Sequence, residues 1–423
     1  MSDLSRVKWA SNRLDGCSLW AVMRSTPLPR YPLAALIGLA LAVPASLAQD
    51  EERPRLRDLG IATGILAPGP LNAITDVAGV RVGHTTLVEG ASVRTGVTAV
   101  VPHGGNVFQE KVPAAVFVAN AFGKAAGLLQ IRELGTLETP VVLTNTLCVG
   151  TAVQAVVDWT LAQPGNEAVR SVNAVVGETN DGYLNDIRRC AVTARDVTDA
   201  IEGAKPGAVE EGSVGAGTGT HLLGWKGGIG TASRRLPASL GGYTVGVLVQ
   251  SNFGGTLTVD GIRVGERLGR YAFREHLAPS RDGEPEAGPA DGGSCMIVLA
   301  TDAPLSPRNL ERVARRAVMG LARTGSFMHH GSGDFVIAFS TRNTEPHVKT
   351  APTAAVELLY GEFVSPLFLA TVEAVEEAVL NSLLKARTVS GRDGHTLEAF
   401  PVDELRQMVE ERRAGRTRPG DGS

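Results

Sequence analysis

The sequence predicts a mixed α/β fold with a large buried core. Of its 423 residues, 43% are hydrophobic and 20% are charged, a balance typical of globular proteins. The 50 glycines and the low aromatic content of 5% favour sheets and turns in which backbones approach closely. Short apolar runs typical of strands are joined by stretches whose apolar residues recur at helical spacing. The length allows two or three domains, but single α/β domains also reach this size.

The chain begins with the pattern of a secretory signal peptide, predicted to span residues 1–48. Arg24 and Arg30 precede an apolar run at residues 33–43, and small residues follow up to Ala48, where cleavage is expected. The run is short for a membrane span, which disfavours a permanent anchor. Met23 fits this pattern better than Met1 as the initiator. We therefore expect a secreted or periplasmic protein with no membrane partner after signal removal.

The segment after the signal is predicted to contain strands, glycine-rich turns and two helices. Strands are expected at residues 80–84, 98–102, 114–119 and 243–249, and helices at residues 152–161 and 194–202. A densely glycine-rich stretch at residues 212–231 precedes the last of these strands. A polar linker containing Pro and Gly follows at residues 278–293 and is expected to be exposed.

After the linker the pattern changes to long apolar elements. An almost uninterrupted apolar strand is predicted at residues 295–301, a single helix from Ser306 to Gly325, a strand at residues 335–340, and a helix starting at Ser365. If the two strands are parallel neighbours, both N-terminal ends lie at one sheet edge, so Ser294 would face a predicted turn at residues 332–334. The basic tail after Glu411 is expected to be loose.

Net charge indicates the class of partner, whereas the cysteines leave the question of a disulfide open. A formal net charge of -3 provides no field that selects nucleic acid, so a small-molecule partner is expected. Cys148, Cys190 and Cys295 remain after signal removal, and no spacing decides whether two of them form a disulfide. The sequence contains neither a Cys-x-x-Cys nor a His-Glu-x-x-His pattern, and it indicates no metal or other cofactor.

Ser294 is the strongest candidate for a nucleophile. It follows Gly292 and Gly293 and joins the polar linker to a buried strand. If the chain is cut before Ser294, that residue carries both a hydroxyl and a free α-amine, so the nucleophile and its base belong to one residue. By itself, however, the local pattern also fits a small residue that starts a strand.

A wider resemblance favours the nucleophile. The sequence resembles the family of L-aminopeptidases/D-esterases and β-peptidyl aminopeptidases, which includes nylon-oligomer hydrolases. The resemblance runs from about Leu56 to about Pro401 and rests on six segments, at residues 215–219, 225–233, 245–252, 293–304, 320–325 and 331–334. It implies a four-layer αββα sandwich of the N-terminal-nucleophile-hydrolase type with its own connectivity. It also implies self-cleavage between Gly293 and Ser294 into a larger chain, 49–293, and a smaller chain, 294–423, within one domain.

The resemblance also implies roles for individual residues. Ser294 corresponds to the nucleophile, Ser332 and Asp334 to a second serine and its acidic partner, and Asn252 to the oxyanion-stabilising asparagine. Some members have Glu at the position of Asp334, so the shorter carboxylate reaches less far here. Taken alone, Asn252 also fits a turn after a strand, and the Gly331 to Asp334 segment also fits an ordinary loop.

Two further residues have competing interpretations. Glu178 resembles the carboxylate that binds the free amine of the substrate, although a solvated or N-capping glutamate also fits the pattern. Asn180 stands where the family often has an aromatic residue. Lys226 lies in the glycine-rich stretch, where it either supports the nucleophile or is an exposed turn residue.

The resulting hypothesis is a self-processing serine aminopeptidase or amidase that acts on small peptides, amides or esters through an acyl-enzyme on Ser294. The resemblance suggests a homotetramer. One alternative is an acyltransferase of the ornithine-acetyltransferase type, which the predicted signal disfavours, and another is an exported non-catalytic binding protein. The glycine-rich segment at residues 215–220 lacks the third glycine of a dinucleotide-binding motif, which disfavours such a site. The adjacent His329 and His330 indicate a polar loop in preference to a metal site.

Overall fold

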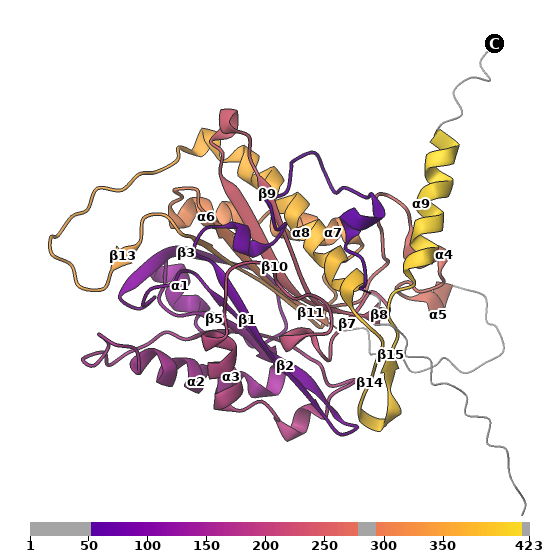
Figure 1. The fold of residues 1–423 in the computed structure, drawn as a ribbon, viewed down its shortest axis with the longest axis horizontal. Helices are drawn as coiled ribbons and strands as arrows, with labels where there is room; N and C mark the ends of the chain where they lie inside the picture. The colour runs from indigo at the N-terminus through magenta and orange to yellow at the C-terminus, as the bar shows by residue number, and fades with distance from the viewer. Residues whose placement is uncertain (1–51, 278–292, 417–423) are drawn as a thin grey trace, which may run out of the picture. The chain divides into compact units, whose positions relative to one another are not determined.

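Two β-sheets packed between two layers of helices form the core of the computed structural model, which describes residues 52–277 and 293–416 (Figure 1). Three clusters of buried apolar side chains mark the interfaces between these layers. One cluster joins the sheets, and the other two join each sheet to its helices. The predicted αββα sandwich is therefore confirmed. The predicted signal, 1–48, and most of the predicted linker lie outside the described residues.

The larger sheet has seven strands and carries the segments that the sequence analysis singled out. Its order is β13-β3-β12-β11-β10-β9, with β4 beside β3. The strands are β3 (Glu110–Ala121), β4 (Thr136–Leu137), β9 (Gly228–Arg235), β10 (Thr244–Asn252), β11 (Gly293–Thr301), β12 (Ser332–Ser340) and β13 (Glu345–Pro346). Strand β11 runs parallel to β12 and antiparallel to β10. The expectation that β11 and β12 are parallel neighbours is thus confirmed.

The smaller sheet has four strands in the order β1-β2-β5-β6. They are β1 (Arg81–Glu89), β2 (Val93–Val101), β5 (Val141–Asn145) and β6 (Val175–Thr179). This sheet faces the larger one through contacts such as Met296 of β11 against β6. At Gly177 of β6, a Cβ atom would lie 2.8 Å from the Met296 sulfur, so a larger residue would have to displace that side chain.

Helices cover the outer face of each sheet. Helices α2 (Val149–Leu161) and α3 (Ala194–Glu202) pack on the smaller sheet, and α6 (Pro307–Ala314), α7 (Ala317–Thr324) and α8 (Ser365–Lys385) form the layer on the larger one. The remaining helices are α1 (Leu128–Leu134), α4 (Val264–Arg267), α5 (Arg274–Leu277) and α9 (Val402–Arg416). Within the described ranges, each helix is too short or too polar to cross a bilayer.

Short elements complete the chain and shape its loops. Two hairpins pair β7 (His221–Leu222) with β8 (Trp225–Lys226) and β14 (Val389–Ser390) with β15 (Thr396–Leu397). The 3-10 helices are η1 (Leu56–Leu59), η2 (Ile74–Asp76), η3 (Thr146–Cys148), η4 (Ile187–Arg189), η5 (Gly215–Gly217), η6 (Ala238–Leu240), η7 (Gly361–Phe363) and η8 (Arg392–Gly394).

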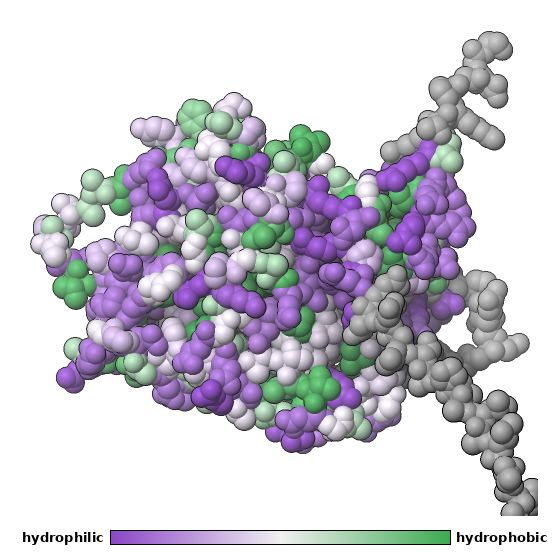
Figure 2. Space-filling view, viewed as in Figure 1, coloured by the Kyte–Doolittle hydropathy of each residue, from purple (hydrophilic) through white to green (hydrophobic). Residues whose placement is uncertain are grey.

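Three local expectations were wrong. The single helix expected from Ser306 to Gly325 is divided into α6 and α7, because the N–H of Arg316 bonds the carbonyl of Val313 three residues back and tightens the turn. The predicted turn at residues 332–334 is the start of strand β12. The tail expected to be loose after Glu411 remains helical to Arg416, and its remaining residues, 417–423, lie outside the described residues. Figure 2 shows that hydrophilic residues cover much of the visible surface of α9.

Candidate active site

The start of β11 lies between the end of β10 and the start of β12, and this junction holds most of the predicted site. In register, Ser294 stands opposite Asn252 on β10 and Gly333 on β12. The Ser294 hydroxyl donates a hydrogen bond to the Gly293 carbonyl at 2.7 Å and accepts one from the Gly333 N–H at 3.3 Å. Only 4% of Ser294 is exposed. The hydroxyl therefore lies at the peptide group that self-cleavage would break.

Gly293 is required by packing at this junction. A Cβ atom at this position would lie 2.5 Å from both the Asn252 carbonyl oxygen and the Phe253 Cα. Contacts this short involve backbone atoms, which cannot move aside as a flexible side chain could. Any larger residue would therefore push β11 away from β10 and displace Ser294.

Ser332 and Asp334 are buried on β12 beside the junction. The Ser332 hydroxyl and both Asp334 carboxylate oxygens make no hydrogen bond to another described residue. Burial raises the pKa of Asp334 to about 6, and the neighbouring Ser332 hydroxyl partly opposes this shift. No hydrogen bond joins either residue to Ser294 among the described residues, so the structure brings the three together along the sheet without connecting them.

Ser294 also lines a pocket of about 400 Å³ between the two sheets' loop ends. Asn252 and Glu178 line the same pocket, so three of the predicted site residues share one cavity. Ser332 and Asp334 are not among its lining residues. Its other walls include Phe122, Tyr183, His221 and Arg392, which the sequence analysis did not single out because no local pattern marks them.

Asn252 is held in one orientation. Its side-chain oxygen accepts a hydrogen bond from the backbone N–H of His221 at 3.0 Å, and its amide nitrogen donates to the backbone carbonyl of Asn180 at 3.1 Å. The amide nitrogen carries two hydrogens, so a second donor remains. Burial lowers the pKa of His221 to about 4, which leaves that pocket-lining ring uncharged at neutral pH.

Glu178 is a buried carboxylate at the end of β6, with 2% of its surface exposed. It accepts hydrogen bonds from the Lys124 backbone N–H at 2.9 Å and from the Thr146 hydroxyl. It forms no ion pair with another described residue. A buried anion that lacks a cationic partner is unfavourable unless a positively charged ligand supplies one.

Lys226 is fully buried, which rules out an exposed turn residue. Its ammonium donates to the carbonyls of Gly217 at 2.8 Å and Gly227 at 2.7 Å. Burial lowers the pKa of Lys226 to about 7, opposed by the nearby Asp181, and burial raises the pKa of Asp181 to about 7. Lys226 does not line the pocket and instead binds the backbone of the glycine-rich segments that contain Gly217 and Gly227.

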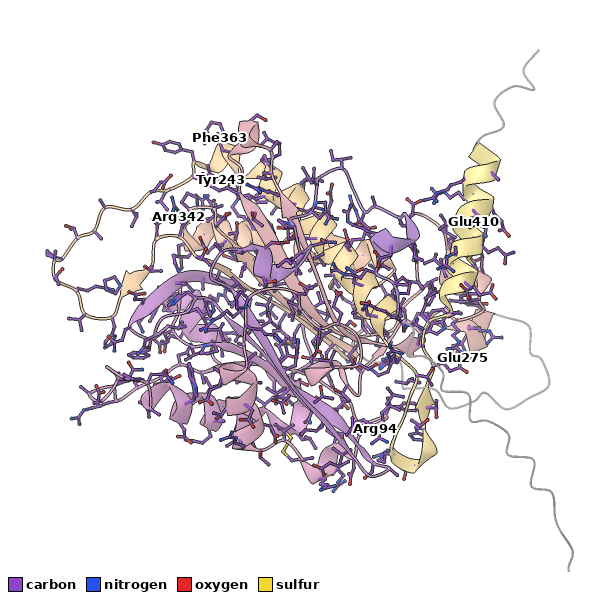
Figure 3. All side chains as sticks on the ribbon, in the orientation of Figure 1. Arg94, Tyr243, Glu275, Arg342, Phe363 and Glu410 are labelled. Carbon is purple, nitrogen blue, oxygen red and sulfur yellow. A yellow bond between two sulfur atoms is a disulfide. The ribbon has the colours of Figure 1, made fainter. Side chains whose placement is uncertain are left out.

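The structure also settles the pairing of the cysteines. Cys148 and Cys190 form a disulfide with Cα atoms 5.5 Å apart, visible as a yellow bond in Figure 3. Cys148 ends η3, which begins at the pocket residue Thr146, and Cys190 follows η4. Cys295 is a free thiol in the core, and burial raises its pKa well above the ordinary value, as does the nearby Asp334.

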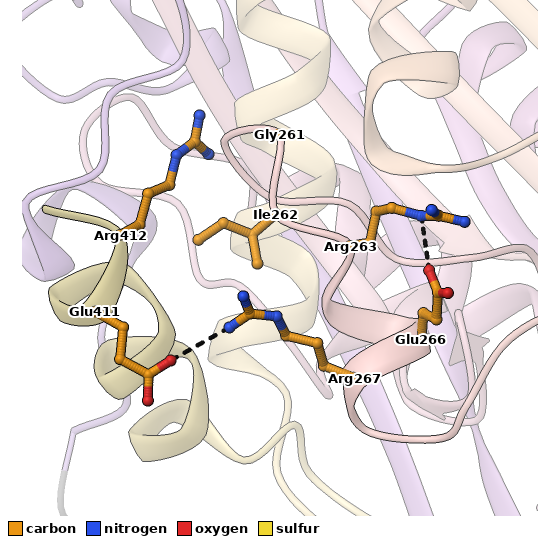
Figure 4. Close-up of a pocket in the computed structure, with 7 residues that line it drawn as sticks. All are labelled: Gly261, Ile262, Arg263, Glu266, Arg267, Glu411 and Arg412. Atoms are coloured by element: carbon orange, nitrogen blue, oxygen red, sulfur yellow. Dashed lines mark hydrogen bonds and ion pairs between the residues drawn. The ribbon is translucent and has the colours of Figure 1, made fainter. Parts of the chain in front are cut away.

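A second groove of about 600 Å³ lies between α4 and α9 (Figure 4). It is lined mainly by charged side chains that already pair with one another, with Arg267 3.3 Å from Glu411 and Arg263 2.7 Å from Glu266. It contains no nucleophilic side chain. In the described part of the chain, no three His, Cys, Asp or Glu side chains converge as a metal site would require. The pocket that Ser294 lines is therefore the stronger candidate for an active site.

The αββα layers, with a serine at the start of a central strand beside a buried asparagine, define a hydrolase of the N-terminal-nucleophile class. The chain belongs to peptidase family S58, whose model matches residues 72–397. It is an enzyme of the aminopeptidase and amidase type.

Three relatives illustrate this membership. The chain is 40% identical over 397 residues to the β-peptidyl aminopeptidase BapA of Sphingosinicella microcystinivorans, covering 91% of this chain and 98% of the relative. The solved PH0078 protein of Pyrococcus horikoshii OT3 is 46% identical, with a TM-score of 0.77 over 86% of this chain and 99% of the other. The L-aminopeptidase D-Ala-esterase/amidase of Ochrobactrum anthropi, described as a variant of the Ntn hydrolase fold, is 37% identical with a TM-score of 0.76, over 86% of this chain and 100% of the other.

Proposed function

We propose that this aminopeptidase makes its own nucleophile by breaking the Gly293–Ser294 bond and then hydrolyses small aminoacyl amides, esters and peptides through Ser294. The observation that carries the proposal is the position of Ser294, whose hydroxyl lies at the Gly293 carbonyl and in the same pocket as Asn252 and Glu178. No other described serine combines these features.

Self-cleavage would proceed by an acyl shift. The Ser294 oxygen bonds to the Gly293 carbonyl carbon, the C–N bond breaks, and the hydroxyl proton ends on the released α-amine. Water then hydrolyses the ester and leaves Gly293 with a carboxylate. Before cleavage the Ser294 nitrogen is an amide and cannot act as a base, so the uncut chain is expected to be an inactive zymogen.

Substrate hydrolysis would use the same two groups of Ser294. The α-amine takes the hydroxyl proton as the oxygen attacks the substrate carbonyl, and then passes it to the leaving amine or alcohol. Water releases the acyl group from Ser294. The Asn252 amide donates to the developing oxyanion, a contribution of about 2.7–4 kcal/mol for donors of this kind.

Ser332 and Asp334 would complete the site once the amine exists. Strands β11 and β12 are paired neighbours, and neighbouring strands lie about 4.8 Å apart. Ser332 and Asp334 on β12 therefore flank the residue that stands opposite Ser294. Their polar atoms have no hydrogen-bond partner among the described residues of the uncut chain and could bind the Ser294 α-amine, which forms only on cleavage. In this arrangement Ser332 orients the amine, and the Asp334 carboxylate stabilises the ammonium formed during turnover.

Glu178 would select substrates with a free amino group. It is buried without a cationic partner, and a substrate ammonium would supply that partner. Because the named activities of the relatives include β-peptidyl, L-aminopeptidase and D-esterase reactions, the proposed acyl groups include both α- and β-aminoacyl groups. We further propose export through the signal peptide, followed by assembly as a homotetramer.

The decisive experiment compares wild-type protein with a Ser294→Ala variant. Mass spectrometry of the wild type should show two chains, one of which begins at Ser294, whereas the variant should remain a single chain. A panel of aminoacyl p-nitroanilides should be hydrolysed by the wild type, not by the variant, and N-acetylation of the substrate should abolish turnover. An intact wild-type chain with full activity would disprove the proposal.

A further inference from the structure

The hairpin formed by β14 and β15 brings a positive charge from the end of the chain to the pocket that holds Ser294. Its connection, η8, begins at Arg392, whose side chain lines the pocket and is 34% exposed. The Arg392 Nε lies 3.0 Å from a carboxylate oxygen of Asp393. The two terminal guanidinium nitrogens make no hydrogen bond to another described residue and are available to a ligand.

Contacts with the pocket wall fix the hairpin in place. The Arg392 N–H donates to the Leu184 carbonyl at 2.7 Å, and the imidazole of His395 stacks on Tyr183 with ring centroids 4.4 Å apart. Arg94, labelled in Figure 3, donates from its Nε to the Ser390 carbonyl at 2.8 Å. These contacts use the backbone of Arg392 and its neighbours, so among the described residues the guanidinium is held only by the ion pair of its Nε with Asp393.

The pocket therefore contains two opposite charges that are held apart. Glu178 is fixed by the loops after β3 and β5, whereas Arg392 is fixed by the loop at residues 182–187 and the hairpin. No ion pair links them among the described residues. A cavity of about 400 Å³ with a separate anion and cation is complementary to a ligand that carries both charges.

We propose that Arg392 binds a free carboxylate on the leaving group, so that the preferred substrates are unblocked dipeptides. This inference rests on the proposed function, in which Glu178 binds the amine and Ser294 attacks the carbonyl between the two charges. The guanidinium fork matches a carboxylate in a bidentate geometry, which an amide or a p-nitroanilide cannot offer. Because one pocket contains Glu178, Ser294 and Arg392, the carboxylate of a longer peptide would extend beyond the reach of Arg392.

The test compares each dipeptide with its own C-terminal amide, which differs only in the charge at the leaving-group end. With processed wild-type enzyme, kcat/KM should favour the free acid about tenfold, or about 1.4 kcal/mol. The difference should appear mainly in KM, since Arg392 would bind the carboxylate in the ground state and the transition state alike. Raising NaCl from about 0.15 M to about 1 M should reduce the preference, because Arg392 is partly exposed.

Variants assign the preference to Arg392. Arg392→Gln keeps the backbone N–H that holds the hairpin and should lower the ratio of acid to amide to about one. Arg392→Lys keeps the charge but loses the fork and should retain part of the preference. Arg263→Gln removes one positive charge outside the pocket and should leave the ratio at its wild-type value.

Equal wild-type rates for acid and amide, or an unchanged preference in Arg392→Gln, would overturn this inference alone. Turnover of aminoacyl p-nitroanilides, which have no carboxylate, tests the proposed function separately. If processed wild-type enzyme does not hydrolyse them or the dipeptides, both the proposed function and this inference fail.

Discussion

Two buried polar clusters in this molecule differ in how they are satisfied. Arg234 on β9 donates to Glu373 at 3.1 Å and to Glu377 at 2.7 Å, both on α8, and also to the backbone carbonyl of Thr63. At the start of β12, by contrast, the Ser332 hydroxyl and the Asp334 carboxylate have no hydrogen-bond partner among the described residues. Both clusters are almost completely buried. Burial of polar groups therefore does not by itself identify a functional site.

The pKa values of the two acids show the same difference. Burial opposes ionisation of Glu377, but Arg234 and hydrogen bonds from Arg57 and Asn72 outweigh it and hold the pKa below its ordinary value. Burial of Asp334 meets no such opposition from a cation, and its pKa rises to about 6. In the first cluster the charged groups pair with one another and join α8 to β9. In the second, the Asp334 carboxylate has no partner among the described residues and can form an ion pair with a new cation.

The largest expected effect tests the unsatisfied cluster. Asp334→Asn should lower kcat about 10²–10⁴-fold, because the ammonium on Ser294 would lose its counter-charge. Wild-type activity should fall toward acidic pH as the Asp334 carboxylate becomes protonated, because burial raises the pKa of Asp334. The part of this limb that comes from Asp334 should be absent from the variant, whereas the part that comes from protonation of the Ser294 α-amine should remain. The measurement is a pH profile of aminoacyl p-nitroanilide hydrolysis, and wild-type kinetics in the variant would contradict the assigned role.

Stability provides the control for the same variant. Because the folded-state pKa of Asp334 is raised, its stabilising contribution is present below about pH 4 and is lost as the pH rises through about 6. In uncut chains that also carry Ser294→Ala, Asp334→Asn should therefore be more stable than the parent chain at pH 8 and similar to it near pH 4. A loss of stability at pH 8 would indicate a structural role for the carboxylate.

The next effect tests the satisfied cluster. Arg234→Leu should lower the free energy of unfolding by about 3–5 kcal/mol, because Glu373 and Glu377 would stay buried without their cation. Urea unfolding of chains that also carry Ser294→Ala measures this on an uncut polypeptide. Replacing both glutamates by leucine as well should recover much of the loss. Unchanged stability in Arg234→Leu would contradict the comparison.

The smallest effect concerns the disulfide beside the pocket. Replacing Cys148 and Cys190 by serine should lower the free energy of unfolding by about 2–4 kcal/mol, since the bond closes a loop between residues 42 apart in sequence. The variant should also raise KM for amino substrates, because η3 carries Thr146, which bonds Glu178. The core Cys295→Ser serves as the contrasting variant, because its thiol is in no disulfide. If KM is unchanged in the double variant, the disulfide does not position the pocket residues.

Several elements were predictable because their signals are local. The apolar run at residues 295–301 is a strand with both faces buried, and Ser306 and Pro307 start α6 as an N-cap and first-turn proline. The predicted helix at residues 194–202 matches α3 in full, where Thr193 and Asp196 form a capping box. The division of the next helix at Arg316 was missed, because a turn tightened by one hydrogen bond leaves the apolar spacing unchanged.

The site was predictable only in part. Gly293, Ser294, Asn252, Ser332 and Asp334 were predicted because short motifs in combination resemble a family. The structure places all five at one junction of strands. The partners that shape the pocket were not found. Arg392 and Tyr183 are more than two hundred residues apart in sequence, and neither lies in a motif.

The sequence by itself determined many of the strands and helices, which serine precedes a buried strand, and that small residues stand where backbones meet, because each of these depends on neighbours along the chain. Only the tertiary structure decided that Glu178 is buried without a cation, that Cys148 pairs with Cys190, and that Arg392 reaches the pocket. These features depend on sheet register and loop packing between distant segments. Periodicity specifies which face of an element is buried, but not what it is buried against.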